Sequence, residues 1–178
     1  MAKKLKDLTE RTEKLKAWIA ALRSGEYAQG RSSLAQKGPG GVINYCCLGV
    51  ACEVAGLERV EVEMGEQLIY KWQITDDNGV VLAKGTEEAI LPPQLVREQT
   101  YPKLLSVCPI ISAISANDSF SLTFDQIADV LESVYLGDGT VAEKILTAIY
   151  ERTEGFVLNI VQIEEMRKGF EDLKKDFE

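Results

Sequence analysis

The sequence predicts an α+β fold, in which a small antiparallel β-meander packs against a buried central helix with peripheral helices around them. A nearly uncharged run over residues 44–56 is long enough to form a core helix that is buried on most sides. Apolar and polar residues then alternate over residues 58–85, which is the pattern of half-buried strands. The chain has 178 residues, of which 46% are hydrophobic, and is predicted to form a single domain over residues 1–178.

The first predicted element is an N-terminal helix within residues 1–25. Apolar side chains recur at helical spacing over residues 5–23, whereas lysines and glutamates fill the other face. Gly25 follows as a residue that readily takes the left-handed conformation at a helix end. The next segment, residues 26–41, is rich in glycine, which predicts an irregular connection with a mobile loop near residues 36–41.

The core helix and the strands follow in that order. Gly56 closes the uncharged run, so we expect the helix to end there and to form the central core element. In the strand region the alternation is clearest over residues 68–75, where one face is apolar and the other is polar. The dipeptide at residues 78–79, Asn-Gly, favours a hairpin turn, and residues 80–84 return as the partner strand. A meander of about three antiparallel strands is expected.

Two features stand out in the segment that leads from the strands to the C-terminal helices. Pro92 and Pro93 predict a short helix that runs to Gln99, because proline is tolerated in a first helical turn. Further along, three isoleucines are candidates for a subunit contact, as is the last helix, and a homo-oligomer is therefore among the expected states. These isoleucines are Ile110, Ile111 and Ile114.

The C-terminal part of the chain, residues 123–178, is predicted to be helical. Thr123 and the glutamine three residues later form a capping box ahead of an apolar-periodic run, which predicts a helix over residues 124–135. Two further helices are expected over residues 140–151 and 162–176. The last of them is highly charged and is expected to be peripheral.

The composition limits the chemistry, because the chain contains no histidine. Histidine is the side chain whose unperturbed pKa allows proton exchange near neutral pH. A Ser-His-Asp triad, a Cys-His pair and any His-ligated metal centre are therefore excluded. The net charge of −8 opposes attraction to nucleic-acid phosphate, and no direct DNA or RNA binding is expected. We predict a binding role without a cofactor, and not an enzyme.

The expected location is the cytoplasm. Residues 1–4 lack the apolar region of a secretory signal, and no stretch approaches the roughly 18 apolar residues of a membrane helix, so no membrane partner is expected. In that compartment the cysteines stay reduced. They are Cys46, Cys47, Cys52 and Cys108.

No metal site is predicted from the remaining candidate ligands. The chain has no Cys-x-x-Cys pair, and the adjacent Cys46 and Cys47 are better explained as small buried hydrophobic residues. Residues 117–119, Asn-Asp-Ser, resemble half of a calcium loop, but Thr123 stands where such a loop requires glycine. Turn formation and helix capping explain these side chains instead.

The candidate binding site is a loop over residues 27–33 that combines an aromatic ring, an amide, a guanidinium and two hydroxyls. In this interpretation Tyr27 stacks on a base, and Arg31 and Lys37 pair with phosphate. The side-chain amides of Gln29 and Asn44 bind the polar edges of the ligand. The alternative left open is that Tyr27 anchors the loop to the core and Arg31 is simply solvated. The candidate ligand-binding residues are Tyr27, Gln29, Arg31, Ser32, Lys37, Asn44 and Tyr45.

Three segments carry a resemblance to a known group of proteins. They read WIAALRSGEYAQG over residues 18–30, YCCLGVAC over residues 45–52 and NDSFSLTFDQIADVLE over residues 117–132. In this order they resemble small uncharacterised proteins of tailed phages and prophages with W-x-x-A-L-x-S-G-x-Y-x-Q-G, C-C-L-G-V-x-C and N-D-x5-F-x-x-I-A-D motifs. The resemblance implies a phage setting and no particular activity. Such a setting favours small proteins that bind host components, nucleotide second messengers among them.

The leading expectation is a non-catalytic phage accessory protein, acting in host takeover or counter-defence, that binds and sequesters a host molecule. A cyclic or linear nucleotide second messenger in the host cytoplasm is the ligand class considered first. One alternative is an acidic protein–protein inhibitor, whose partner is a host enzyme or a nucleic-acid-binding protein. A second alternative is a metal-dependent carboxylate enzyme with its site around Asp118 and Asp125.

Overall fold

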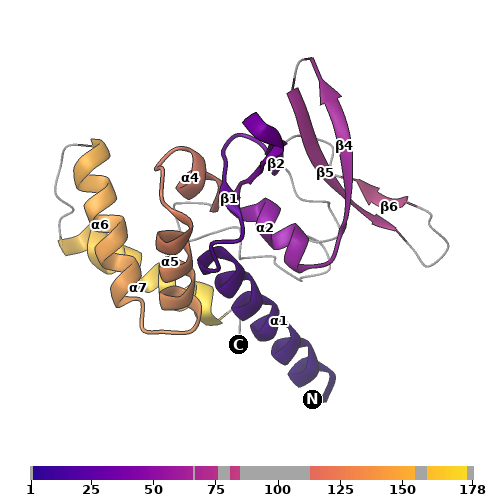
Figure 1. The fold of residues 1–178 in the computed structure, drawn as a ribbon. Helices are drawn as coiled ribbons and strands as arrows, with labels where there is room; N and C mark the ends of the chain where they lie inside the picture. Colours follow the sequence, from indigo (N-terminus) through magenta and orange to yellow (C-terminus); the bar gives the residue numbers. More distant parts are fainter. Residues whose placement is uncertain (1, 66, 76–80, 85–112, 155–159, 176–178) are drawn as a thin grey trace.

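The computed structural model describes residues 2–65, 67–75, 81–84, 113–154 and 160–175, and it confirms an α+β fold (Figure 1). A mixed sheet lies on one side, α5, α6 and α7 lie on the other, and α1 and α2 lie between them. The helices are α1 (Ala2–Arg23), α2 (Cys47–Val54), α4 (Ala113–Asp118), α5 (Phe124–Tyr135), α6 (Thr140–Glu154) and α7 (Ile160–Lys175). The strands are β1 (Ala28–Gln29), β2 (Ala35–Lys37), β3 (Ile43–Tyr45), β4 (Glu58–Met64), β5 (Gln67–Thr75) and β6 (Val81–Lys84).

The sheet has the strand order β1-β3-β2-β5-β4, and β6 pairs with β5 beyond the end of β2. Only the β1–β3 pair is parallel among the described strands, and the others are antiparallel. The predicted meander is confirmed as β4, β5 and β6, with β5 paired to both neighbours. The turn predicted at residues 78–79 lies outside the described residues, as do the predicted helix ending at Gln99 and the isoleucines at positions 110 and 111.

The prediction of an irregular connection over residues 26–41 is wrong. Residues 26–41 contain β1 and β2, with a short 3₁₀ turn over Pro39–Gly41 before β3. Strands of two or three residues are too short to show a period of two, so the sequence pattern could not reveal them. The core helix also begins later than predicted, at Cys47, because Asn44 and Tyr45 belong to β3.

The central helix α2 is buried, as predicted, between α1 and the sheet. Every residue from Cys47 to Cys52 is buried, and Gly56 follows the helix with a φ of 69°. The indole Nε1 of Trp18, on α1, donates to the carbonyl oxygen of Cys47 at 2.9 Å. This bond satisfies a buried polar group at the point where the two helices meet, and it fixes their relative position.

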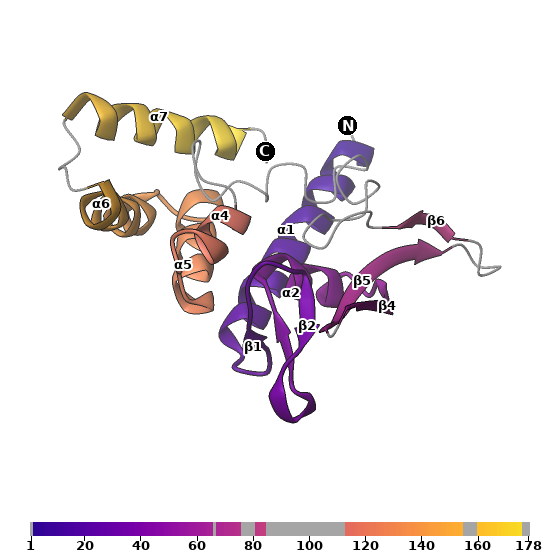
Figure 2. The same ribbon diagram turned by 90° about the horizontal axis from the view of Figure 1, so that it is seen from above.

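Helix α5 joins the sheet half of the molecule to the C-terminal helices (Figure 2). Its residues Ile127, Val130 and Leu131 are fully buried, and it packs against α1, α6 and α7. Arg23, at the end of α1, bridges Asp129 and Glu132 of α5 at 2.6 and 2.7 Å. The predicted helices over residues 140–151 and 162–176 correspond to α6 and α7, whereas α4 was not predicted.

Helix α7 is less peripheral than the charge of its sequence indicated. Two of its side chains, Met166 and Phe170, are buried and join the same core as α1, α2 and α5. Lys174, near its end, donates to the carbonyl oxygen of Gly137 at 2.9 Å. A narrow apolar stripe is therefore enough to dock this helix while its other faces stay charged. None of the described helices combines the length and apolar character that crossing a membrane requires.

The N-terminus of α5 has the predicted capping box, and its loss has a measurable expected effect. Thr123 Oγ1 accepts from the Gln126 amide at 3.2 Å, and Gln126 Oε1 accepts from the Thr123 amide at 3.0 Å. Thr123→Ala is expected to lower the free energy of unfolding by about 1 kcal/mol in a urea titration. The exposed Ser119→Ala is the control and is expected to change it by less than about 0.5 kcal/mol. Equal effects of the two substitutions would contradict the capping role.

Candidate functional site

The loop over residues 27–33 lies between β3 and the end of α4. Gln29 pairs with Tyr45 in the parallel β1–β3 ladder, and the Gly30 amide donates to the Tyr45 carbonyl oxygen at 2.6 Å. On its other side the Gly30 carbonyl oxygen accepts from Asn117 Nδ2 at 2.9 Å. The loop is thus attached by its backbone to the sheet and to the helical half of the protein.

A fully buried side-chain amide, that of Asn117 on α4, holds this loop. Its Nδ2 donates to Gly30 O and, at 2.6 Å, to Asp118 Oδ1, while its Oδ1 accepts from Gln29 Nε2 at 2.8 Å. Both amide protons and one oxygen lone pair are therefore used. A buried polar group with all of these partners fixes one arrangement of the chain, because any rearrangement would leave donors unpaired.

Gln29 belongs to the same set of hydrogen bonds, which joins the 27–33 loop to α4 and the beginning of α5 and is called the junction below. Its side-chain amide is therefore not free to bind a ligand. Its Nε2 also donates to the carbonyl oxygen of Leu122 at 2.8 Å, and its Oε1 accepts from the Phe124 amide at 3.1 Å. The second of these bonds satisfies an amide at the beginning of α5, which has no partner within the helix. The side chain of Gln29 thus fastens β1 to the α4–α5 connection.

Arg31 and Ser32 lie on the exposed side of the junction. Arg31 Nε donates to the Asn117 carbonyl oxygen at 3.2 Å, and the Ser32 amide donates to Asp118 Oδ2 at 3.2 Å. Ser32 has a φ of 69°, a conformation that non-glycine residues adopt rarely. Among the described residues no carboxylate forms an ion pair with Arg31, so its two terminal nitrogens are directed to no counter-charge there.

Tyr27 and Tyr45 belong to an aromatic cluster on the core-facing side of the sheet. Their ring centroids are 5.2 Å apart at an interplanar angle of 89°, and Tyr45 lies 6.5 Å from Trp72. Arg59 Nη1 donates to the Tyr45 hydroxyl at 2.7 Å and to Glu53 Oε1 at 3.1 Å. Burial, with a further contribution from Glu53, raises the pKa of both tyrosines, so both hydroxyls stay protonated at neutral pH.

The same cluster extends along β5. The guanidinium carbon of Arg59 lies 4.9 Å from the ring centroid of Tyr70, which is a cation–π contact. The Trp72 indole is fully buried, and its Nε1 has no hydrogen-bond partner among the described residues. Tyr45 is only 8% exposed, so its role is mainly to support Tyr27, which is half-buried.

Lys37 and Asn44 lie on opposite faces of the sheet. Ala35 pairs with Tyr45 and Gln36 pairs with Asn44, so Lys37 shares the Tyr45 face whereas Asn44 shares the other. Lys37 is exposed on β2. Of the predicted ligand-binding residues, the structure brings Gln29, Arg31 and Ser32 together around α4. It brings Tyr27 to Tyr45, and it places Asn44 against the backbone of Gly30 in the same loop, with its side-chain amide next to Gly38.

The described cysteines pack in the core. Cys46, Cys47 and Cys52 are free thiols with at most 3% exposure, and Cys47 Sγ donates to the Ala113 carbonyl oxygen at 3.3 Å. The pKa of Cys46 is lowered by its hydrogen bond with the Cys47 thiol and by the backbone amides of α2. The pKa of Cys47 is raised by the same hydrogen bond and by burial. Cys108 lies outside the described residues. In the described part of the chain no three Cys, Asp or Glu side chains gather as metal ligands.

Sequence reasoning missed the importance of Asn117, which it had explained as a turn residue. The three segments that carry the phage resemblance contact one another here: Trp18 bonds to Cys47, and Gln29 bonds to Asn117. Gly49 completes the junction, because a Cβ at this position would overlap the carbonyl oxygen of Leu34. The signal available in the sequence was the presence of polar residues near glycines in these distant segments. The sequence alone does not show that the segments contact one another.

A protein-family model matches most of the chain. The family model described as Domain of unknown function (DUF8296) matches residues 11–135, which run from within α1 to the end of α5. No curated protein and no solved structure matches the chain. The matched range contains the whole junction around Asn117 and ends before α6 and α7.

Proposed function

The chain belongs to the DUF8296 family, a domain of unknown function, and we propose that it is a non-catalytic binding protein for a small phosphorylated ligand. The ligand lies against the exposed side of the 27–33 loop, where Arg31 pairs with phosphate and the half-buried Tyr27 offers ring surface to a base. Gln29 and Tyr45 support the site from beneath.

The observation that supports the proposal is the hydrogen bond that orients the Arg31 guanidinium. Its Nε is held by the Asn117 carbonyl oxygen, and the residue behind that oxygen is itself fully buried and bonded. The guanidinium thus loses little freedom when a ligand arrives, and this lowers the entropic cost of binding. Its terminal nitrogens have the fork geometry that recognises phosphate oxygens.

A nucleotide fits this surface better than a larger polyanion does. The net charge of −8 disfavours a long phosphate chain, whereas the one arginine and the one tyrosine of the 27–33 loop match one phosphate and one base. The resemblance to small tailed-phage proteins supports a setting in which the ligand is a host molecule, such as a nucleotide second messenger, that the protein sequesters. This setting is the part of the proposal that depends on the resemblance alone.

Thermal-shift measurements with ATP, cyclic AMP and cyclic dinucleotides test the proposal. A ligand present at 100 times its dissociation constant is expected to add about 2.7 kcal/mol to the stability of the folded state. Arg31→Ala is expected to weaken binding at least about tenfold, because a charge-assisted bond of roughly 1.5–3 kcal/mol is removed.

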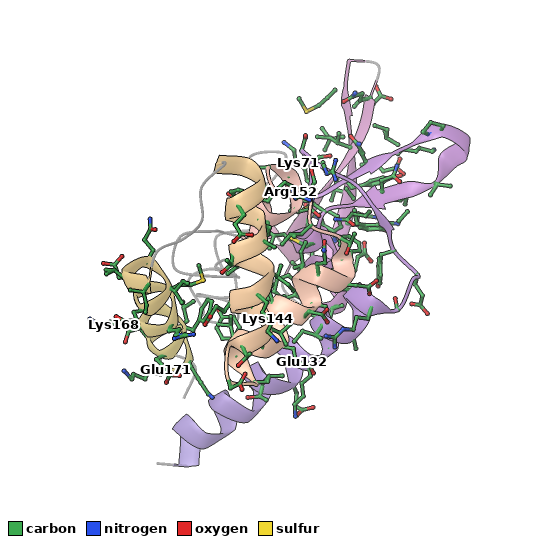
Figure 3. All side chains as sticks on the ribbon, turned by 90° about the vertical axis from the view of Figure 1, so that its left-hand side faces the viewer. Lys71, Glu132, Lys144, Arg152, Lys168 and Glu171 are labelled. Atoms are coloured by element: carbon green, nitrogen blue, oxygen red, sulfur yellow. The ribbon has the colours of Figure 1, made fainter. Side chains whose placement is uncertain are left out.

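The matched control is Arg152→Ala. Arg152, on α6, is also exposed and also makes one bond to a backbone carbonyl oxygen, that of Phe120 at 3.2 Å (Figure 3). It is expected to leave nucleotide binding unchanged. Equal loss from the two substitutions would indicate unspecific charge attraction, and no shift with any nucleotide rejects the proposed ligand class. Conversion of a nucleotide to product would favour the enzyme alternative.

A further inference from the structure

Strand β4 forms one edge of the sheet (Figure 1). All seven of its residues pair with β5 in one continuous register, from Glu58 opposite Gln73 to Met64 opposite Gln67. No strand of the described chain pairs with its other side. Alternate residues of an edge strand direct their N–H and C=O groups away from the sheet, so β4 carries a row of backbone groups that no described strand pairs.

The side chains of β4 alternate in character as well as in direction. Glu61 and Glu63 point to the same face as Tyr70 and are exposed, and neither forms an ion pair with a described residue. Val60 and Val62 point to the opposite face and are half-buried. Met64 follows on that face with 43% of its surface exposed. The edge is thus acidic on one face and apolar on the other.

The basic residue of β4 does not neutralise these carboxylates. Arg59 is already bonded to Glu53 and to the Tyr45 hydroxyl, and its guanidinium lies over the Tyr70 ring. These contacts hold the guanidinium toward α2 and away from the outer edge. The charge that β4 presents to an approaching strand is therefore that of its glutamates.

We propose that the open edge of β4 accepts an extended segment of a basic partner protein, in which basic and apolar residues alternate. The segment adds a strand to the sheet, with main-chain hydrogen bonds supplying affinity and side chains supplying specificity. Residues directly opposite each other in paired strands have Cβ atoms about 5 Å apart and share a face. Lysine or arginine thus lies opposite Glu61 and Glu63, and an apolar residue lies opposite Val62.

A second copy of this chain fits the edge less well. In an antiparallel pairing of two β4 strands centred on residue 61, Glu61 lies opposite itself, and like charges directly opposite each other are destabilising. Arg59 lies opposite Glu63 in that register, but its guanidinium is already bonded to Glu53 and the Tyr45 hydroxyl. A pairing centred on Val62 places Glu61 opposite Glu63 twice. The whole chain also carries a net charge of −8, which opposes self-association and attracts a basic partner. The β4 surface is distinct from the loop at residues 27–33, and the inference does not depend on the proposed ligand.

The test uses the full chain and a synthetic capped peptide of alternating lysine and valine, measured by fluorescence anisotropy. A peptide of the same composition with its lysines and valines in separate blocks is the peptide control. We expect the alternating peptide to bind more tightly, with affinity that falls as salt is added. Amide hydrogen exchange within residues 58–64 is expected to slow on binding, at alternate positions. This protection separates strand addition from attraction between surface charges.

Charge reversal supplies the matched protein variants. Glu61→Lys/Glu63→Lys is expected to weaken binding of the alternating peptide at least about tenfold, since two favourable pairs become repulsive. Glu164→Lys/Glu165→Lys makes the same change in net charge on two exposed residues of α7, and is expected to change affinity less than about twofold. Arg31→Ala is expected to leave peptide binding unchanged, so failure here and failure of the nucleotide proposal are distinguishable.

Three outcomes overturn the inference. One is equal binding of the alternating and block peptides. Another is binding without slowed exchange in β4, which would mean that the peptide attaches elsewhere. The third is protection of β4 that grows with protein concentration in the absence of peptide, because this would make a second copy the occupant.

Discussion

Gly49→Ala is expected to lower the free energy of unfolding by about 3 kcal/mol, although alanine is the better helix former. Gly49 lies within α2, where helix propensity alone would make the substitution stabilising by roughly 1 kcal/mol. The added Cβ would instead overlap the Leu34 carbonyl oxygen, which accepts the Cys46 amide at 3.0 Å. Backbone atoms cannot rotate aside as a side chain does, so α2 must move away from Leu34, which precedes β2, and the hydrogen bond between Cys46 and Leu34 is lost.

Urea denaturation followed by circular dichroism measures this effect. Gly25→Ala is the control, since Gly25 has a φ of 73° and open space around its Cβ position. Its expected cost is about 1 kcal/mol, from the left-handed conformation alone. If Gly49→Ala were neutral or stabilising, the close approach of α2 to Leu34 would be wrong.

Asn117→Ala is expected to cost about 3 kcal/mol and to lower the melting temperature by roughly 6–12 °C. The substitution leaves the Gly30 carbonyl oxygen without its donor and removes the acceptor of Gln29 Nε2. Burial prevents water from replacing these partners without disturbing the packing, so the cost is larger than for a surface hydrogen bond.

A double-mutant cycle that combines Asn117→Ala with Gln29→Ala measures the coupling free energy between these two side chains. The two side chains share a hydrogen bond, so the effect of both substitutions together is expected to be smaller than the sum by about 1 kcal/mol. Additive effects would mean that the two amides act independently. Arg152→Ala combined with Asn117→Ala is expected to be additive, because the structure shows no hydrogen bond between those two side chains.

Long elements with strong local signals could be predicted from the sequence. Helix α5 spans Phe124–Tyr135 as predicted, because the capping box marks its beginning and its apolar period marks its length. The antiparallel pairing of β4 and β5 follows from alternation over many residues. In these segments local and tertiary preferences agree, so the pattern alone is sufficient.

The short strands could not be predicted, because tertiary pairing creates them. β1 has two residues and exists through its bonds to β3, which in turn depends on β2. One of the glycines that suggested an irregular connection, Gly30, has a different reason. A Cβ at Gly30 would lie 2.9 Å from the Asn44 Cβ, so glycine permits the close approach of β1 to β3.

The residue types of the candidate loop could be identified from the sequence, but not their contacts. The sequence named Gln29, Arg31 and Ser32 as polar groups of this loop, but it could not show that the Gln29 amide is fully bonded inside the protein. Nor could it show that Asn117, 88 residues further along the chain, holds the loop. Hydrogen bonds between distant segments leave no local period, so they appear only when the chain is folded.

The two tryptophans of the chain, Trp18 and Trp72, are both fully buried, and this gives the protein two optical reporters of its own. Trp18 lies where α1 meets α2, whereas Trp72 lies in the sheet beside Tyr45. Their emission is expected to be blue-shifted in the native state and to move to longer wavelength when water reaches the indoles. Replacing either one by phenylalanine isolates the other, so separate melting of the helical and sheet halves would appear as two non-coincident fluorescence transitions.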